Sequence, residues 1–330
     1  MLRWLLAALL LSACAPMRQA VLAPETETLA TARAPGTDFR VVSWNVSRDD
    51  IYQQIDGFRA VLAALDADVL ILDEMPVADD DSKLVSALAG LGDVERPWHV
   101  VYGISGYGQR STIAAQLPMQ RVAEFDHLQY SDTFARSWLD SATDQDNRER
   151  RQRYLSAGMA QVGARIRTEQ GQLMVVGLDF QCCGNGGNSW EEAMRRTEAA
   201  ALRAALESAS AAQPAAGIVV GGDFNAVNGP APLLITMGEP DLQTHLTTVQ
   251  ASHLDGVEHW TWDGSGTPFA SGRLDYQMHD ARLRVAAAWV FDSTDLPVEQ
   301  QRELMLEEIE MTKLSQHRPV VVDYAWVNSP

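Results

Sequence analysis

A buried strand that ends in two polar residues constrains the fold of this chain more than any other stretch. Residues 217–222 read Gly-Ile-Val-Val-Gly-Gly, a β-branched run typical of a buried strand, and Asp223 and Asn225 follow it. Because side chains two apart in a strand lie on the same face, the strand would deliver a carboxylate and an amide into one pocket. The same residues also fit an ordinary Asp/Asn turn. The rest of the chain must decide between the two interpretations.

The beginning of the domain predicts a β–α–β unit whose strands also end in polar residues. Residues 39–46 are rich in strand-forming residues, residues 49–65 have apolar residues at helical spacing, and residues 67–72 form a short apolar strand. Asn45 ends the first strand and Glu74 follows the second. Both would lie at one edge of a sheet, where such folds place ligands.

Later segments continue this alternation. We expect strands at 98–102 and 111–115, a short helix at 83–91, and a hairpin of residues 154–166 and 172–178 that ends at Asp179. A helix is expected from Ser189 to residue 208, with Ser189 as its N-cap, and another over 298–311. Asp275 lies in a β-like segment, His317 precedes a closing strand at 320–324, and residues 139–152 are polar enough to predict an exposed loop or insertion.

Size and charge limit the classes of partner. A chain of 330 residues with 46% hydrophobic residues can bury the core of one large domain or two small ones. Acidic residues outnumber basic residues 44 to 26, which gives a net charge of −18. This charge disfavours nucleic acid as a partner without excluding it, since binding to a phosphate backbone requires a basic face.

The first 37 residues predict export and a membrane anchor. Residues 1–13 contain a short basic start and an apolar run too short to span a bilayer, as in a signal peptide. Leu11-Ser12-Ala13-Cys14 resembles the lipobox of bacterial lipoproteins, although a secretory signal with a chance cysteine also fits. The resemblance implies lipidation of Cys14 and a location in the bacterial cell envelope. The rest of residues 14–37 is rich in Ala, Pro, Thr and Glu without apolar periodicity, which predicts a linker. With Ala15 next, we expect the outer membrane, on its periplasmic side or at the surface.

Five short motifs in order connect these strand ends to a known family. Together they resemble the endonuclease/exonuclease/phosphatase superfamily, the DNase I-like fold, over residues 38–326. Asp73-Glu74 stands where the family usually has Gln-Glu. The other matches are Trp44-Asn45, Gly222-Asp223-Phe224-Asn225, Thr261-Trp262 with Arg273-Leu274-Asp275-Tyr276, and His317-Arg318-Pro319.

The resemblance implies a four-layer α/β/β/α sandwich over residues 38–330, a monomer, and hydrolysis of a phosphoester substrate with a divalent cation. The cation expected is Mg²⁺, with Mn²⁺ or Ca²⁺ as alternatives, because hard cations prefer oxygen ligands. By the family pattern, Glu74 is the principal metal ligand and Asn45 supports it.

The remaining matched residues are expected to handle the phosphate and the water. Asp223 would align and activate the attacking water, and Asn225 would contact the phosphate. His317 would face the phosphoryl group as an acid, a base or a transition-state stabiliser, and Asp275 would hold its imidazole in one tautomer.

Two further positions depart from the family pattern. Asp179 stands where the family has a histidine that donates to the phosphate, and Gln316 stands where it has an aspartate before the last histidine. Asp179 could bind a metal, be protonated, or repel the phosphate. The alternative function is therefore a catalytically impaired member that acts as a binding protein.

Two loops beside these residues carry side chains of uncertain role. Cys182 and Cys183 are adjacent in a loop expected over the site, and either a vicinal disulfide or two free thiols would fit. The glycine-rich residues 103–110 could bring Arg110 near an anionic substrate, but an ordinary hairpin loop is favoured.

Overall fold

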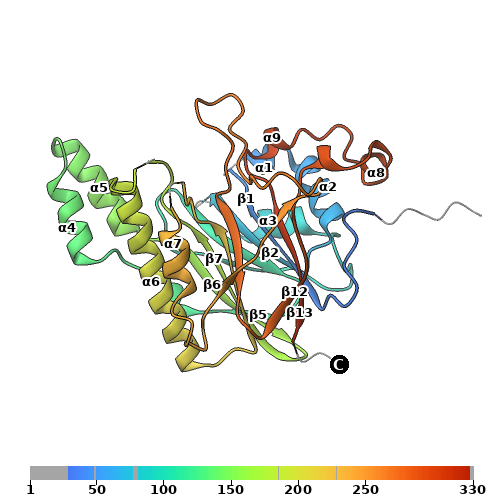
Figure 1. Ribbon diagram of the computed structural model, residues 1–330, viewed down its shortest axis with the longest axis horizontal. Coiled ribbons are helices and arrows are strands. Elements are labelled where there is room, and N and C mark those ends of the chain that lie inside the picture. The colour runs from blue at the N-terminus through green and yellow to red at the C-terminus, as the bar shows by residue number, and fades with distance from the viewer. Residues whose placement is uncertain (1–28, 48–49, 77–80, 185, 228, 328–330) are drawn as a thin grey trace, which may run out of the picture.

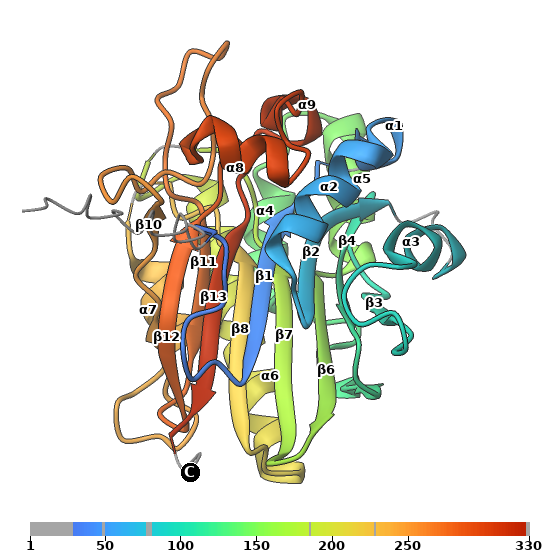
Figure 2. The ribbon, with the colours of Figure 1, turned by 90° about the vertical axis from the view of Figure 1, so that its right-hand side faces the viewer.

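The protein has four layers, with two β-sheets stacked face to face and helices on both outer faces (Figures 1 and 2). A computed structural model describes residues 29–47, 50–76, 81–184, 186–227 and 229–327. This arrangement confirms the α/β/β/α sandwich expected from the sequence.

The first sheet has seven strands, and β1 lies near its centre, parallel to β2 and antiparallel to β13. In spatial order its strands are β10 (Ser252–His253), β12 (Leu283–Val290), β13 (Val320–Trp326), β1 (Phe39–Asn45), β2 (Val69–Pro76), β4 (Gln109–Ala115) and β3 (His99–Tyr102).

The second sheet has six strands, with β7 parallel to β8 in its middle. Its strands in order are β5 (Met119–Arg121), β6 (Ala160–Thr168), β7 (Gly171–Asp179), β8 (Gly217–Asp223), β11 (Asp275–His279) and β9 (Thr247–Thr248). The helices are α1 (Asp50–Gln53), α2 (Ile55–Leu65), α3 (Asp81–Leu88), α4 (Asp132–Asp140), α5 (Gln145–Ala157), α6 (Trp190–Ala212), α7 (Ala231–Met237), α8 (Val298–Glu303) and α9 (Met311–Leu314), with 3₁₀ turns at Ala123–Phe125 and Ser293–Asp295.

Three apolar clusters hold the layers together. One lies between the sheets and includes Ile71, Val175 and Val322. A second joins the first sheet to the α1–α3 side, and a third joins the second sheet to α6. Both sheets are therefore buried on two faces, which explains why β1, β2 and β8 have near-continuous apolar sequences.

Glycines let the two sheets approach closely near the ends of β7 and β8. A Cβ atom at Gly177 or at Gly221 would lie 3.0 Å from a methyl group of Ile71, which comes from the opposite sheet. Gly222 has φ +140°, and a Cβ atom there would lie 1.9 Å from the carbonyl oxygen of Leu178 and 2.9 Å from Asp73 Oδ2. Only glycine fits this position.

The structure corrects the prediction of an exposed loop over residues 139–152. This segment belongs to a helical hairpin of α4 and α5, which packs beside α6 (Figure 1). Ser131 and Asp144 cap the two helices, and Trp138 and Leu155 are buried. Buried aromatic packing outweighs the polar composition of the segment, which hid the helices. The expected strand at 154–166 is shorter for the same reason, since Tyr154 lies in α5 and β6 begins at Ala160.

Two predicted helices are interrupted. The helix expected over 49–65 is divided into α1 and α2 at Gln54. The helix expected over 298–311 ends at Glu303, and Met305 then has φ +58°, a left-handed conformation that stops α8. The helix predicted from Ser189 is confirmed, and the Ser189 hydroxyl accepts a hydrogen bond from the backbone N–H of Glu192.

The chain already contacts the domain before residue 38. The backbone N–H of Ala34 donates to Asp323, whose carboxylate also forms a fully buried ion pair with Arg40. Residues 30 and 34, which fall within the predicted linker, therefore bond to the domain. The predicted signal segment and Cys14 lie outside the described residues. Within the described part of the chain, none of the helices is long and apolar enough to cross a membrane.

Replacing Gly222 by alanine should destabilise the fold. The new Cβ atom would collide with Leu178 O in a backbone conformation that L-residues rarely adopt, so the free energy of unfolding should fall by about 2 kcal/mol or more. Gly229→Ala is the matched control, because a Cβ atom there meets nothing within 4 Å. Urea denaturation measures both variants, and equal stabilities would contradict the close contact of Gly222 with Leu178 on the neighbouring strand.

Candidate active site

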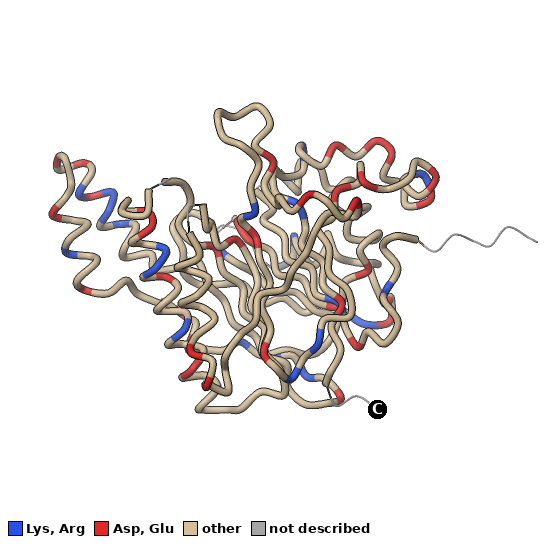
Figure 3. The backbone as a smooth tube through the Cα atoms, viewed as in Figure 1, with Lys and Arg blue, Asp and Glu red and all other residues tan. Residues whose placement is uncertain are grey.

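Polar residues from both sheets converge where the central strands end. In register, Asn45 of β1 lies beside Asp73 of β2, and Asp223 of β8 lies between Asp179 and Asp275. Figure 3 shows acidic residues gathered at the upper ends of these strands. The edge predicted from the sequence is therefore the place where most of the predicted residues meet.

Asn45 connects the two predicted carboxylates. Its amide nitrogen donates to Glu74 Oε1 at 3.2 Å and to Asp223 Oδ2 at 3.1 Å. Its amide oxygen accepts from the backbone N–H of Ser47 at 3.1 Å. Asn45 thus orients Glu74 and Asp223 through hydrogen bonds, while its expected role as a direct metal ligand stays a prediction.

Asp73 joins the two sheets and was missed as a site residue. Its Oδ2 accepts the backbone N–H of Asp223 at 3.2 Å, and the side chain is fully buried. Burial, with the charges of Asp223 and Asp275, raises the pKa of Asp73 well above that of a free carboxyl. Its position where relatives have glutamine was the only sequence signal.

His317 is held by Asp275, as expected. His317 Nδ1 and Asp275 Oδ2 are 2.8 Å apart, and His317 Nε2 lies 3.8 Å from Asp223 Oδ2. Thr261, whose role the sequence did not reveal, donates its hydroxyl to the same Asp275 oxygen at 2.6 Å. With Nδ1 donating to Asp275, the imidazole presents Nε2 to Asp223 and to the site.

The pKa values of Asp223 and His317 are shifted by each other's charges and by the charge of Asp275. Burial and the charge of Asp275 raise the pKa of Asp223 to about 7, and the charge on His317 opposes the rise. Burial alone would lower the pKa of His317, but Asp275 and Asp223 outweigh burial and raise it to about 9. At neutral pH the imidazole is therefore protonated, as a group that donates a proton or stabilises negative charge must be.

Two site residues have left-handed backbones. Glu74 has φ +57° and Asn225 has φ +46°, conformations that cost energy for non-glycine residues and often occur at functional sites. The expectation that strand alternation directs Asp223 and Asn225 to one face is wrong, because β8 ends at Asp223. Instead, the backbone N–H of Asn225 donates to Asp223 Oδ1 at 2.8 Å. The two residues therefore form a turn, and this turn is part of the site. Asn225 Nδ2 donates to Phe180 O at 3.0 Å, and its contact with phosphate stays a prediction.

Asp179 is buried beside the other carboxylates. Gln109, at the start of β4 in the other sheet, donates its amide to Asp179 Oδ2. Burial and the charges of Glu74 and Asp223 raise the pKa of Asp179 well above its ordinary value. In its neutral form this carboxyl can donate a hydrogen bond, which the ionised form cannot. The raised pKa favours the protonated form in the cation-free protein, while the metal-binding role stays a prediction.

The buried carboxylates at these strand ends are suited to bind a divalent cation. Burial raises the pKa of Asp73, Asp179 and Asp223, and the charges of neighbouring carboxylates raise each of them further, an effect that a bound cation would oppose. Among the described residues, the buried Asp275 Oδ1 has no hydrogen-bond partner. Ligand atoms of Asp223, Asp275 and His317 also lie within 4.8 Å of one another. Since His317 and Asp275 bind each other, this trio is better suited to proton handling, and Glu74 remains the expected metal ligand.

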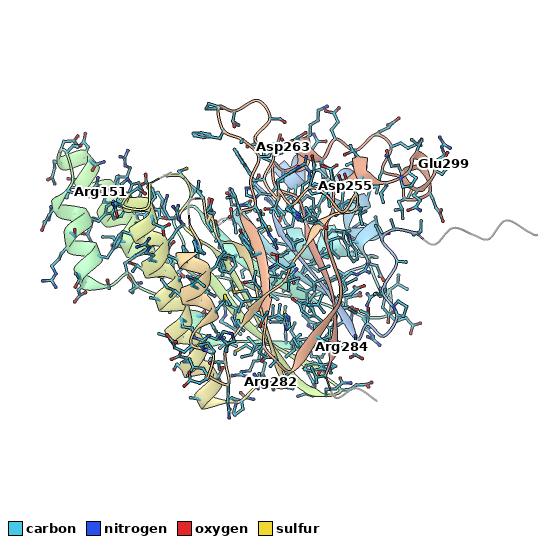
Figure 4. The ribbon with its side chains drawn as sticks, in the orientation of Figure 1. Arg151, Asp255, Asp263, Arg282, Arg284 and Glu299 are labelled. Carbon is cyan, nitrogen blue, oxygen red and sulfur yellow. The ribbon has the colours of Figure 1, made fainter. Side chains whose placement is uncertain are left out.

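The structure also shows the surroundings of four neighbouring side chains whose roles the sequence left open. Gln316 donates to the carbonyl of Asp263, at the base of the loop that rises above the site (Figure 4). Arg110 lies over the ring of Tyr102 at 3.9 Å. Cys182 and Cys183 are free thiols in this structure, which is one of the two states that the sequence left open.

Comparisons with known proteins agree with this geometry. The model of the Endonuclease/Exonuclease/phosphatase family matches residues 42–317. The chain belongs to this family. No curated protein sequence matches it, but members of the endonuclease/exonuclease/phosphatase family with solved structures share its fold.

Three of these solved structures illustrate the likeness. The human Nocturnin catalytic domain with bound sulfate has 15% identity and TM-score 0.54, covering 90% of this chain and 96% of that one. ANGEL2, a 2′,3′-cyclic phosphatase, has 13% identity and TM-score 0.55 over 88% and 96% of the two chains. A family protein from Bacteroides vulgatus has 14% identity and TM-score 0.53 over 88% and 99%. At these identities the likeness supports the fold and not a substrate.

Asp275→Asn should lower the pKa of His317. The substitution removes the charge that holds the imidazolium, so the pKa should fall from about 9 by roughly 1–2. NMR titration of cation-free protein measures it. Asp295→Asn is the control, because Asp295 contacts His253 at 3.0 Å and not His317. A His317 pKa unchanged in Asp275→Asn would contradict the pairing.

Glu198 should make stability depend on pH. Its carboxylate lies beside the site and accepts two hydrogen bonds, one from the Tyr130 hydroxyl at 2.9 Å and one from the backbone N–H of Gln181 at 2.7 Å. Burial raises the pKa of Glu198 to about 7, so the folded state holds its proton to higher pH than the unfolded state does. Relative to Glu198→Gln, the wild type should lose about 1–3 kcal/mol of unfolding free energy as pH rises from about 4.5 to 8. A constant difference across this range, measured by urea denaturation, would refute the shift.

Proposed function

We propose that this protein is a divalent-metal-dependent phosphoester hydrolase tethered in the bacterial cell envelope. The observation that carries the proposal is the pairing of protonated His317 with Asp275 beside Asp223, next to the Asn45–Glu74 contact. Family members act on phosphoesters, and this site has the parts that such hydrolysis requires.

The residues divide the reaction between them. Glu74, oriented by Asn45, would hold the cation, and the cation would neutralise charge on the phosphoryl oxygens. Asp223 would accept a proton from the attacking water and align it. Protonated His317 would donate to a phosphoryl oxygen, and its charge would stabilise the transition state. Asp179, held by Gln109, would occupy the place of the histidine that donates to the phosphate in relatives, and it would donate a hydrogen bond while its carboxyl is neutral.

The envelope location rests on the sequence alone. The lipobox-like segment ending at Cys14 supports a lipid anchor on the outer membrane, facing the periplasm or the surface. The net charge of −18 makes small phosphoesters or phospholipid head groups better candidates than nucleic acid.

Metal-dependent hydrolysis should be lost when either side of the site is removed. Purified protein should release nitrophenol from bis(p-nitrophenyl) phosphate with Mg²⁺ or Mn²⁺ and not with EDTA. Glu74→Ala and His317→Ala should each reduce kcat/KM by roughly 100-fold or more. The matched controls are Glu239→Ala and His127→Asn, two exposed residues outside the site.

A broader panel of phosphomonoesters and phosphodiesters, each with Mg²⁺, Mn²⁺ and Ca²⁺, separates the two candidate functions. If no substrate is turned over and calorimetry detects no cation binding, the enzyme proposal is wrong. The chain would then be an impaired family member that acts as a binding protein.

A further inference from the structure

Two adjacent thiols lie on the loop that follows Asp179. Cys182 and Cys183 are both exposed and free, and their sulfur atoms are 2.8 Å apart. The loop joins β7 to α6 beside the helical hairpin (Figure 1). An S–S bond is about 2.05 Å long, so the sulfurs would need to approach by less than about 1 Å to form one.

The surrounding contacts hold the backbone of this pair in place. Arg195, whose side chain is buried, donates to the carbonyl oxygens of Gln181 at 2.9 Å and of Cys183 at 2.7 Å. The backbone N–H of Gln181 donates to Glu198 at 2.7 Å. Cys183 has φ +67°, an uncommon conformation for a non-glycine residue. The helix α6 therefore anchors the loop on both sides of Cys182.

A metal site is a poorer explanation of these thiols. Soft metals require deprotonated thiolates and further ligands. Partial burial of its sulfur and the adjacent Cys183 raise the pKa of Cys182, which disfavours the permanently deprotonated thiolate that a metal site requires. In the described part of the chain, neither cysteine belongs to a group of three ligand atoms close enough to hold an ion. Exposure and contact between the sulfurs instead favour chemistry in which the two react with each other.

We propose that Cys182 and Cys183 are a modification site, at which a small disulfide such as oxidised glutathione reversibly converts the two thiols into a vicinal disulfide. One cysteine thiolate attacks the glutathione disulfide, forms a mixed disulfide and releases one glutathione. The other cysteine thiol then loses its proton and attacks the protein-bound sulfur, which closes the Cys182–Cys183 bond and releases the second glutathione. The cysteine sulfurs are oxidised, the reagent is reduced, and both protons end on the released thiols.

The closed ring would restrain the backbone next to the site. Phe180 lies between Asp179 and this loop, and its carbonyl oxygen accepts a hydrogen bond from the side-chain amide of Asn225. Oxidation would therefore stiffen a segment in direct contact with the turn that holds Asp223. Formation of the ring itself does not depend on phosphoester hydrolysis.

Mass spectrometry of the full-length protein tests the proposal. Trypsin should release residues 168–195 with both cysteines and without Cys14. After treatment with oxidised glutathione, the mass of this peptide should fall by about 2 Da and the peptide should resist alkylation. Dithiothreitol should restore the original mass and the reaction with the alkylating reagent. Cys182→Ser and Cys183→Ser should instead retain one glutathione.

Two results would overturn the proposal. The first is a wild-type peptide that keeps one or two glutathiones without closing the ring. The second is ring closure as fast in urea-unfolded protein as in native protein, since the anchored loop should accelerate closure by about tenfold or more. Either result leaves the assay of hydrolysis unaffected, so its failure is distinct from failure of the proposed function.

Discussion

Close packing of the two sheets is the constraint on which the site depends. Gly177 and Gly221 make room for Ile71 of the opposite sheet, and Gly222 permits the contact between Asp73 and the backbone of Asp223. Strand ends from separate sheets thereby come within hydrogen-bonding distance. The residues that orient Asp223 come from both sheets, so the site exists only when the sandwich is assembled.

Electrostatic repulsion is the second consequence of this packing. Several carboxyl groups are removed from water at one edge, and burial raises their pKa values together. His317 offsets part of this repulsion with its positive charge. A divalent cation would offset more of the repulsion between these carboxylates. The same repulsion should destabilise the cation-free fold and increase its affinity for a hard cation.

Local patterns in the sequence predicted the strands and the polar residues at their ends, and the resemblance to the family implied the four layers and the roles of the site residues. Buried strands such as β8 have continuous β-branched runs, and short motifs mark their ends. The α4–α5 hairpin was missed because its stability comes from aromatic contacts with distant residues, such as Trp138 with Trp190, and not from apolar periodicity. The roles of Asp73, Gln109 and Thr261 were hidden for a similar reason, since each acts through a partner remote in sequence. The left-handed turn at Asn225 could not be predicted from strand alternation.

The position of a bound cation tests the central claim most directly. Crystals grown with Mn²⁺ can be measured by anomalous diffraction, which locates the ion without reference to activity. The account predicts one strong peak about 2.1 Å from a carboxylate oxygen of Glu74, on the side facing Asp223 and His317. A peak bound elsewhere, or no peak at saturating Mn²⁺, would contradict it.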